Sequence, residues 1–343
     1  MNRKYLIFIL ILFILFLVVI LYRNYAIESF EDSTEYTDDI KIDIVYTWVD
    51  GNDPKWKQKK AESTSNITPQ VYEDARYQNM DELKYSLRSV FKYANWVNKI
   101  YIVVDDIQSP MFVNIENPKI QIVKHSEIMS HEYLPVFNSV AIEANIHHIP
   151  NLSENFLYLN DDVFFGNFVS KRDVYNICYY EENPFFDSTE ISEKDDEWIC
   201  NIKNGYQLIK TKYPNAKLYI PTHDSHFCKR SLMYEIENTW TDVYKNTLKQ
   251  KLRKTNTDVK CNSICLPKMQ YILGICKGIY KPILANTDEH LYFDMFNQND
   301  IGELRNIGTT KPKFFCVNNN NSYSEELYNI MNRFFDFKSP YEI

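Results

Sequence analysis

Short apolar runs alternate with helical patterns over residues 42–159, and this alternation restricts the fold more than any other feature of the chain. Four of the runs have the length and composition of buried strands: residues 42–49, 99–104, 120–123 and 155–159. Two segments between them repeat their apolar residues at helical spacing: residues 80–93 and 138–147. Strands that alternate with helices indicate a parallel sheet covered on both faces. We therefore predict an α/β fold, in which helices flank a mostly parallel sheet.

The second half of the chain shows fewer clear patterns. Its apolar spacing predicts helices at residues 224–251, 268–276 and 324–335, and a late strand at residues 314–317. The predicted fold also includes a helical insertion. Residues 169–219 carry many charges and Pro184 without a clear period, so no element is predicted there.

The sequence NFLYLNDDVFFG, residues 155–166, ends a predicted strand with two adjacent carboxylates, Asp161 and Asp162. In open α/β sheets, ligands bind outside the carboxyl ends of the strands. Adjacent carboxylates repel one another unless a cation lies between them, and a divalent metal that carries a diphosphate would meet this need. The alternative is an ordinary polar loop, because Asp-Asp pairs are common in loops.

An unbroken apolar run at residues 6–21 lies between Tyr5 and Tyr22 and, with these tyrosines, is just long enough to span a bilayer. Arg3 and Lys4 precede the run and favour a cytoplasmic N-terminus, although one arginine also follows it. We therefore predict a single-pass membrane protein whose catalytic part is lumenal or extracellular. A cleaved signal peptide is the alternative, but the apolar core is long and no clear small-residue cleavage site follows it.

These features divide the chain into three expected parts: a cytoplasmic tip and transmembrane anchor at 1–23, an acidic linker at 24–40 and one domain at 41–343. The linker is most simply a solvated spacer. The whole chain has a formal net charge of −8 and no run of Lys or Arg, which argues against a general nucleic-acid-binding protein.

Four ordered blocks of sequence together resemble the Stealth family. The first is IDIVYTWVDGNDPKW at residues 42–56, and the second runs from Arg76 to Gly166 and includes the two aspartates. The third is YIPTHDSHFCKR at residues 219–230, and the fourth is KPKFFCVNNNN with FFDFKSPYE near the C-terminus. The family includes the α/β subunit of the lysosomal-enzyme GlcNAc-1-phosphotransferase and bacterial capsular-polysaccharide phosphotransferases.

The resemblance implies a nucleotide-sugar-binding sheet. It also implies transfer of a sugar 1-phosphate, expected to be N-acetylhexosamine 1-phosphate, from a UDP-sugar to a hydroxyl of a glycan or glycoprotein acceptor, with release of UMP. Such a reaction needs cations at the phosphates and a base for the hydroxyl. We expect Asp161 and Asp162 to bind Mg²⁺ or Mn²⁺. His223 is the expected general base, with His226 in reserve, because imidazole titrates near neutral pH. A lone histidine is more often structural, but two lie in this block.

Further candidates would bind the nucleotide sugar. Arg230 and Arg76 are candidates for the phosphates, since guanidinium pairs with phosphate in a bidentate manner, and either could instead form a surface ion pair. Four residues follow the first predicted strand, where nucleotide recognition is expected: Trp48, Asp50, Gly51 and Asn52. Trp48 could stack on uracil or belong to the core. Asn138 and Ser139 begin a predicted helix, where they could bind sugar or phosphate or simply cap the helix.

Two departures from the family pattern affect the expected site. Relatives commonly carry a carboxylate in the fourth block, where this chain has Asn318-Asn319-Asn320, so Asn319 would have to bind the metal through its amide oxygen. The Arg-Ser element that usually follows the third block is missing, and Lys260 lies in that region. A lysine is a point charge and does not replace the planar guanidinium.

Two other functions remain open. A glycosyltransferase with a similar sheet would break the anomeric bond and release UDP, whereas a non-catalytic relative would bind a glycan or a partner without any chemistry. The fourth-block asparagines favour the non-catalytic relative, and the DxD spacing of many glycosyltransferases is absent. A homodimer is one assembly that this chain could form.

Overall fold

The computed structural model describes residues 36–64, 77, 79–182, 189–192, 195, 197–252, 262–294, 298–318 and 325–343. The chain divides into two compact units, Met1–Asp39 and Ile40–Ile343. All helices and strands named below belong to the second unit.

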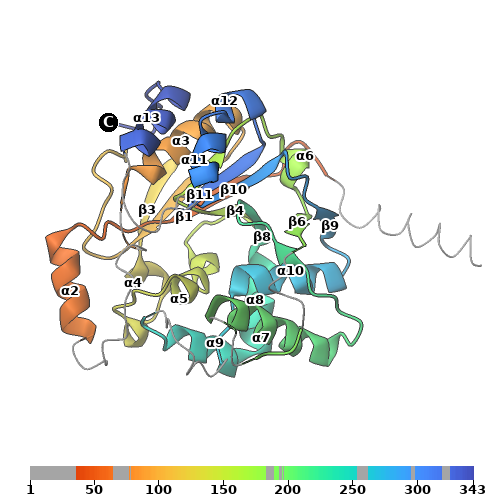
Figure 1. Ribbon diagram of the computed structural model, residues 1–343. Coiled ribbons are helices and arrows are strands. Elements are labelled where there is room, and N and C mark those ends of the chain that lie inside the picture. The colour runs from red at the N-terminus through yellow and green to blue at the C-terminus, as the bar shows by residue number, and fades with distance from the viewer. Residues whose placement is uncertain are drawn as a thin grey trace, which may run out of the picture. The chain divides into compact units, whose positions relative to one another are not determined.

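A five-stranded sheet forms the centre of this unit, with the order β3-β2-β1-β4-β8 (Figure 1). Its strands are β1 (Ile42–Thr47), β2 (Ile100–Val104), β3 (Ile120–Lys124), β4 (Asn155–Asn160) and β8 (His226–Lys229). The first four run parallel, and β8 runs antiparallel to β4. The four strands predicted in the first half of the chain are therefore confirmed, with small shifts of their ends.

The strand order reverses between β1 and β4. From β1 the chain moves outward through β2 and β3, and then returns to place β4 on the other side of β1. In parallel α/β sheets such a reversal opens a crevice outside the carboxyl ends of the two strands, where ligands bind. Thr47 and Asn160, which end β1 and β4, lie opposite each other, so the segments that follow them share this edge.

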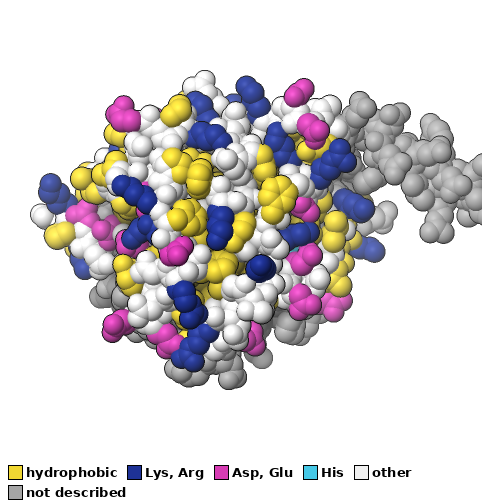
Figure 2. Space-filling view, turned by 90° about the horizontal axis from the view of Figure 1, so that it is seen from above, with side chains coloured by type: hydrophobic (Ala, Val, Ile, Leu, Met, Phe, Trp, Pro, Cys, Tyr) yellow, Lys and Arg dark blue, Asp and Glu magenta, His cyan; other side chains and the backbone are white. Residues whose placement is uncertain are grey.

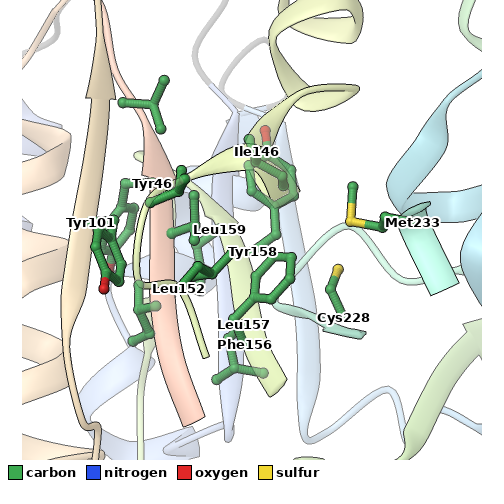
Figure 3. Packing of buried hydrophobic residues seen from close by; sticks show 14 of the residues in the cluster. Tyr46, Tyr101, Ile146, Leu152, Phe156, Leu157, Tyr158, Leu159, Cys228 and Met233 are labelled. Carbon is green, nitrogen blue, oxygen red and sulfur yellow. The ribbon is translucent and has the colours of Figure 1, made fainter. Parts of the chain in front are cut away.

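The main sheet is buried on both faces, as parallel sheets require. Side chains alternate along β4, so that Leu157 and Leu159 point to one face and Phe156 and Tyr158 to the other, and all four are buried. Figure 3 shows these four side chains in one cluster with Cys228 of β8. The packing of β4 in the core therefore fixes the position of the residues that follow it, Asp161 and Asp162.

Two three-stranded sheets complete the fold. The first has the order β10-β11-β5 and consists of β10 (His290–Asp294), β11 (Phe314–Asn318) and β5 (Val163–Phe165). The second has the order β7-β6-β9 and consists of β6 (Ile177–Glu181), β7 (Ile220–Pro221) and β9 (Lys281–Leu284). Because β4 ends at Asn160 and β5 begins at Val163, Asp161 and Asp162 alone form the turn from the main sheet into the first small sheet.

Helices lie on two sides of the sheets in Figure 1. One group consists of α3 (Glu82–Tyr93), α11 (Gln298–Leu304), α12 (Ile307–Thr310) and α13 (Glu325–Phe334). The other consists of α5 (Ser139–Glu143), α7 (Glu197–Lys212), α8 (Arg230–Thr239), α9 (Thr241–Leu248) and α10 (Leu266–Cys276). The remaining helical segments are α2 (Pro54–Thr64), α4 (His125–Ile128), α6 (Lys171–Val174) and the 3-10 turns η2 (His131–Tyr133) and η3 (Ile146–His148).

A buried ion pair ties the C-terminal segment to α3. Arg88 donates to both carboxylate oxygens of Glu342, with Nη2 and Oε2 2.8 Å apart, and to the carbonyl oxygen of Phe335. The Arg88 and Glu342 side chains are 11% and 6% exposed, so water screens the pair weakly. Burial opposes ionisation of Glu342, but the bonds from Arg88 and Ser339 outweigh it and hold its pKa below the usual value.

The surface seen in Figure 2 mixes both signs of charge. Lys and Arg side chains are interspersed with Asp and Glu on this face, and hydrophobic side chains lie among them. A mixed face gives little long-range attraction for an anionic ligand. Recognition of such a ligand therefore depends on individual groups in a site.

The predicted fold class requires correction in its sheet and its helical insertion. The structure has three sheets with parallel and antiparallel strands, in place of one mostly parallel sheet. The helix predicted at 224–251 was wrong at its start, where β8 forms, and α8 and α9 follow. Residues of β8 pair with β4 and are largely buried, so cross-strand packing overrides their helical spacing.

The predicted membrane anchor also requires correction. Within the residues that the structure describes, no helix has the length and apolar character needed to cross a bilayer. The predicted single-pass topology, with its lumenal or extracellular domain, therefore has no support among the described residues. The apolar run at residues 6–21, on which that prediction depended, lies outside the described residues.

Candidate active site

Asp161 and Asp162 lie at the switch point of the main sheet, which is the place between β1 and β4 where the strand order reverses. Both side chains are half-buried in the turn between β4 and β5. The carbonyl oxygen of Asp162 accepts from the Val317 N–H at 3.0 Å, which ties the turn to β11. The alternation along β4 directs Asp161 to the same face as Leu159, which is the face that α3 covers.

A third carboxylate, Glu82, comes from the first residue of α3. Tyr46 of β1 donates to the Ser86 hydroxyl at 2.7 Å, and Ser86 donates to the carbonyl oxygen of Val163 at 2.5 Å. These bonds fix α3 against both β1 and β5. Glu82 itself accepts from the Met80 N–H at 2.6 Å, which holds its side chain at the helix start.

The three carboxylates oppose one another's ionisation. Burial raises the pKa of Glu82 to about 7, and the charges of Asp162 and Asp81 add to the rise. Burial, together with the charges of Glu82 and Asp162, raises the pKa of Asp161 well above its usual value. Burial also raises the pKa of Asp162 to about 6, although a bond from the Cys316 thiol works against the rise.

This acidic cluster fits a hard divalent cation. In the described part of the chain, the first two basic side chains of α3 are engaged elsewhere, Lys84 with Asp81 and Arg88 with Glu342. Oδ1 of Asp162 is buried and has no hydrogen-bond partner among the residues that the structure describes. Mg²⁺ and Mn²⁺ prefer carboxylate oxygens, so the residue types of Asp161, Asp162 and Glu82 suit such an ion. Within the described residues their carboxylate oxygens do not all lie within 4.8 Å of one another, so the side chains would have to rotate to bind one ion together.

In EDTA, we expect the free energy of unfolding to fall as the pH rises from about 4.5 to about 7. The folded-state pKa of Glu82, about 7, lies above its ordinary value of 4.5, so protonation favours the folded state. This contribution is fully present below pH 4.5 and is lost as the pH rises through 7. Urea unfolding at a series of pH values measures it.

The matched variants for this prediction are Glu82→Gln and Glu116→Gln. Glu82→Gln cannot ionise and should flatten the fall. Glu116 is exposed, and Glu116→Gln should leave the profile unchanged. An unflattened profile for Glu82→Gln would show that Glu82 does not titrate as described.

One face of the β10-β11-β5 sheet turns toward these carboxylates. The β10-β11 register pairs His290 with Phe314, Tyr292 with Cys316, and Asp294 with Asn318. Paired residues point to the same face of a sheet. On this face Cys316 contacts Asp162, and the Asn318 amide donates to the Tyr292 hydroxyl. The sheet therefore forms a wall beside the acidic cluster.

His223 lies beside this wall. Its half-buried ring meets the Tyr292 ring edge-on, with centroids 5.3 Å apart at 81°. Tyr292 is the register partner of Cys316, and Cys316 contacts Asp162. The structure thus brings His223 to the side of the acidic cluster that faces β10 and β11.

The residue after His223 belongs to a buried Asp-His pair. Asp224 accepts from Nδ1 of His290 at 2.6 Å and from the Thr222 hydroxyl at 3.0 Å. Nε2 of His290 is buried and finds no hydrogen-bond partner within the described part of the chain. In the neutral ring, Nδ1 donates to Asp224 and Nε2 carries the lone pair.

Arg230 is not brought to the acidic cluster. Its guanidinium donates to the carbonyl oxygens of His147 at 2.8 Å and of Leu152 at 3.3 Å. Its own N–H donates to the carbonyl oxygen of Glu154. These partners precede β4, whereas Asp161 follows it, so Arg230 lies at the opposite end of the strand. The guanidinium is held there by backbone carbonyls, which explains why it does not reach the predicted phosphate site.

Three other predicted residues have structural contacts. His226 is buried in β8 opposite Tyr158, and burial holds its pKa well below the usual value, with neighbouring cationic groups adding to the effect. It is therefore a neutral core histidine. The buried side chain of Asn138 caps α5 by accepting from the Val140 N–H at 3.1 Å. Ser139 is the first residue of that helix and is half-buried.

The loop after β1 places four predicted residues at the switch-point edge: Trp48, Asp50, Gly51 and Asn52. Trp48 is 7% exposed and belongs to the core, but its buried indole N–H meets no hydrogen-bond partner among the described residues. Asp50 exchanges two backbone hydrogen bonds with the Gln108 side chain. Gly51 packs so closely that a Cβ there would lie 2.1 Å from the carbonyl oxygen of Tyr77.

Some candidates cannot be placed, and others were missed. Arg76, Asn319, Asn320 and Lys260 lie outside the described residues. The sequence reasoning did not single out Glu82 or His290. Glu82 stands in an ordinary helical pattern, but its position at a helix start within the second block was an available signal. No sequence pattern marked His290, since only the fold brings it into contact with Asp224, 66 residues earlier in the chain.

Comparison with known proteins finds two matching family descriptions and several curated relatives. Residues 41–67 match Stealth protein CR1, conserved region 1, and residues 76–183 match Stealth protein CR2, conserved region 2. The chain is 30% identical to the capsular polysaccharide phosphotransferase fcs1 of Haemophilus influenzae, over 88% of this chain and 84% of the relative. It is 31% identical to the capsular polysaccharide phosphotransferase LcbA of Neisseria meningitidis, over 87% of this chain and 82% of the relative.

An exopolysaccharide phosphotransferase of Streptomyces coelicolor is 33% identical over 88% of this chain, which spans only 51% of that relative. Solved structures with some likeness include the galactosyltransferase LgtC in complex with donor and acceptor sugar analogues. It has a TM-score of 0.37 and 12% identity, over 86% of this chain and 94% of the other. Mouse xyloside xylosyltransferase 1 has a TM-score of 0.37 and 8% identity, and the match covers 83% of this chain and 100% of the xylosyltransferase chain. These structural likenesses are too distant to carry an argument.

Proposed function

Because this chain belongs to the Stealth family, we propose that it transfers a sugar 1-phosphate from a UDP-sugar to a hydroxyl of an acceptor glycan and releases UMP. The relatives that it matches over most of their length are named capsular polysaccharide phosphotransferases. An N-acetylhexosamine 1-phosphate is the proposed group, and the acceptor is a glycan or a glycoprotein. No finding supports a homodimer, and the domain limits at 41–343 stay a prediction.

The observation that carries this proposal is the acidic cluster at the switch point. Asp161 and Asp162 follow β4 at the edge where ligands bind in such sheets, and Glu82 joins them from α3. Asp161, Asp162 and Glu82 would hold Mg²⁺ or Mn²⁺, whose positive charge, when bound, would stabilise charge on the phosphate oxygens. A structural role would not explain why these carboxylates are held where they repel one another. It would also not explain why Oδ1 of Asp162 has no partner among the described residues.

In the proposed reaction, the acceptor hydroxyl oxygen attacks the phosphorus that carries the sugar. The new bond is the oxygen–phosphorus bond to the acceptor, and the bond that breaks joins the two phosphates, so UMP leaves with its electron pair. His223 takes the hydroxyl proton. Its ring is half-buried and lies beside Tyr292, which supports this role.

Asp224 and His290 would position His223. Asp224 follows His223 in the chain and is fixed by His290 and Thr222, so the loop that carries His223 cannot turn freely. Nε2 of His290 is fully enclosed, which favours a positioning role over direct proton transfer. On this account, His290→Gln should lower the turnover rate and leave its pH profile in place, whereas, if His290 were the general base, the variant would lose the acidic limb of the profile, where protonation of the base lowers the rate.

The deciding experiment incubates the purified full-length protein with UDP-GlcNAc, an oligosaccharide acceptor and Mn²⁺, and separates UMP from UDP by ion-exchange chromatography. We expect UMP, with a loss of about 10²–10⁴-fold in His223→Ala, which is the usual contribution of a general base. His131→Ala is the control, because His131 is exposed on η2.

Each other product pattern supports a different function. Release of UDP in place of UMP would show that the anomeric bond of the sugar is cleaved and would identify a glycosyltransferase. Neither product, with several nucleotide sugars and acceptors, would favour a non-catalytic relative that binds glycan. UMP release that survives His223→Ala would keep the phosphotransferase and reject the proposed base.

A further inference from the structure

Two adjacent histidines and a glutamate form a second polar cluster, separate from the acidic one. Nε2 of His147 and Nε2 of His148 lie 2.8 Å and 2.9 Å from the same oxygen, Oε2 of Glu237. The histidines belong to η3, which precedes β4, and Glu237 belongs to α8, which follows β8. The cluster therefore lies toward the amino end of β4, whereas Asp161 and Asp162 follow its carboxyl end.

Hydrogen bonding around His148 leaves its Nε2 without a proton in the neutral ring. Nδ1 of His148 lies 3.1 Å from the carbonyl oxygen of Ile128, which can only accept, so Nδ1 carries the N–H. The Nε2 lone pair then faces a carboxylate oxygen, and two acceptors 2.9 Å apart repel each other. A cation between Nε2 and Oε2, or an added proton, would remove this repulsion.

The surroundings of His148 are those of a metal ligand. Histidines that bind a metal commonly donate their other ring N–H to a backbone carbonyl, which fixes the ring orientation, and the Ile128 carbonyl does this here. No described Lys or Arg side chain pairs with Glu237, whose ion-pair partners are the two histidines. Arg230, the nearby cation, is held by the carbonyls of His147 and Leu152 and lies over the Tyr234 ring.

The three ligand atoms are close enough for one ion. They lie within 4.8 Å of one another. A tetrahedral Zn²⁺, with metal–ligand distances of about 2.0–2.2 Å, needs its ligand atoms about 3.3 Å apart, so small side-chain rotations would admit it. The side chains of His148 and Glu237 are 26% and 24% exposed, which leaves room for a water as the fourth ligand.

We propose that His147, His148 and Glu237 form a binding site for a transition-metal ion of the Zn²⁺ class. Two imidazoles with one carboxylate suit Zn²⁺ and its neighbours in the transition series, whereas Mg²⁺ prefers oxygen ligands. The bound ion links η3 to α8 and so fastens the segment that leads into β4. Binding to the folded state alone stabilises that state.

The test uses the full-length protein, stripped of metal with EDTA and then dialysed. Zn²⁺ binding is measured by competition with a chromogenic chelator, and thermal unfolding is followed with and without Zn²⁺. We expect wild-type protein to bind Zn²⁺ at this site and to melt at a higher temperature with the ion. Glu237→Gln and His148→Gln should each bind at least about tenfold more weakly and lose the added stability.

Matched variants separate this site from other Zn²⁺ ligands. His131→Gln removes an exposed histidine, Cys276→Ser removes a half-buried thiol, and Asp161→Asn weakens the acidic cluster; all three should keep the site. Equal melting temperatures of wild type and Glu237→Gln in EDTA would show that the variant folds. Wild-type binding no tighter than that of Glu237→Gln and His148→Gln would overturn the proposal and leave a proton as the partner of His148.

Discussion

The Asp161→Asn protein is expected to lose about 10³-fold of its transfer rate while becoming more stable in EDTA. The substitution removes one of three carboxylates that would hold the divalent cation, so the charge developing on the phosphate would lose its counter-charge. It also removes a charge whose ionisation is opposed by burial and by Glu82 and Asp162. Loss of activity and gain of stability should therefore occur in the same variant.

Two measurements on one preparation test this expectation. UMP release is followed at saturating Mn²⁺, and urea unfolding is followed in EDTA at neutral pH. Asp288→Asn is the matched control, because Asp288 is exposed in the turn before β10 and should change neither quantity. A variant that loses activity and stability together would point to a disrupted fold, and full activity in Asp161→Asn would remove Asp161 from the mechanism.

Glu342→Ala is expected to lower the free energy of unfolding by about 3–5 kcal/mol, the usual cost of breaking a buried ion pair. The variant leaves the Arg88 guanidinium with the carbonyl oxygen of Phe335 but without its carboxylate. Desolvation of an unpaired charge then opposes folding. Urea unfolding at neutral pH measures the loss, and two-state behaviour is checked by comparing two spectroscopic probes.

The double variant Arg88→Met/Glu342→Leu is the control for this prediction. Replacing both charges by apolar side chains of similar size removes the desolvation cost, so most of the lost stability should return. If Glu342→Ala unfolds like wild type, the pair contributes nothing to stability. If the double variant is as unstable as the single one, packing rather than charge explains the loss.

Local patterns predicted the part of the fold in which neighbouring segments interact. The apolar runs that became β1, β2 and β4 are buried on both faces, so their composition alone distinguishes them, whereas β3, at the edge of the sheet, is only partly buried. The strand β8 was missed because HFCK also fits a helix, and its pairing with β4 is a contact over 70 residues of chain. Antiparallel pairing of a short strand leaves no periodicity to detect.

The candidate site divides in the same way. Asp161 and Asp162 could be selected because they follow a strand directly, where a parallel sheet collects its ligands. Glu82 and the Asp224–His290 pair depend on packing between distant segments, which a single sequence does not encode in any spacing. Arg230 was misplaced for a related reason: a guanidinium has no local preference between phosphate and backbone carbonyls, and only the fold decides which it meets.

The contact between Arg88 and Glu342 has a consequence for biosynthesis. It joins residues 254 positions apart, and Arg88 belongs to the helix whose first residue is Glu82. A contact at such separation forms late, because it needs residues synthesised long after Arg88 and because closing so long a loop costs conformational entropy. A growing polypeptide can therefore assemble the parallel strands while still attached to the ribosome, but it can lock the helix that carries Glu82 only after residues 335–342 emerge. Proteins truncated before residue 342 should accumulate in this unlocked form.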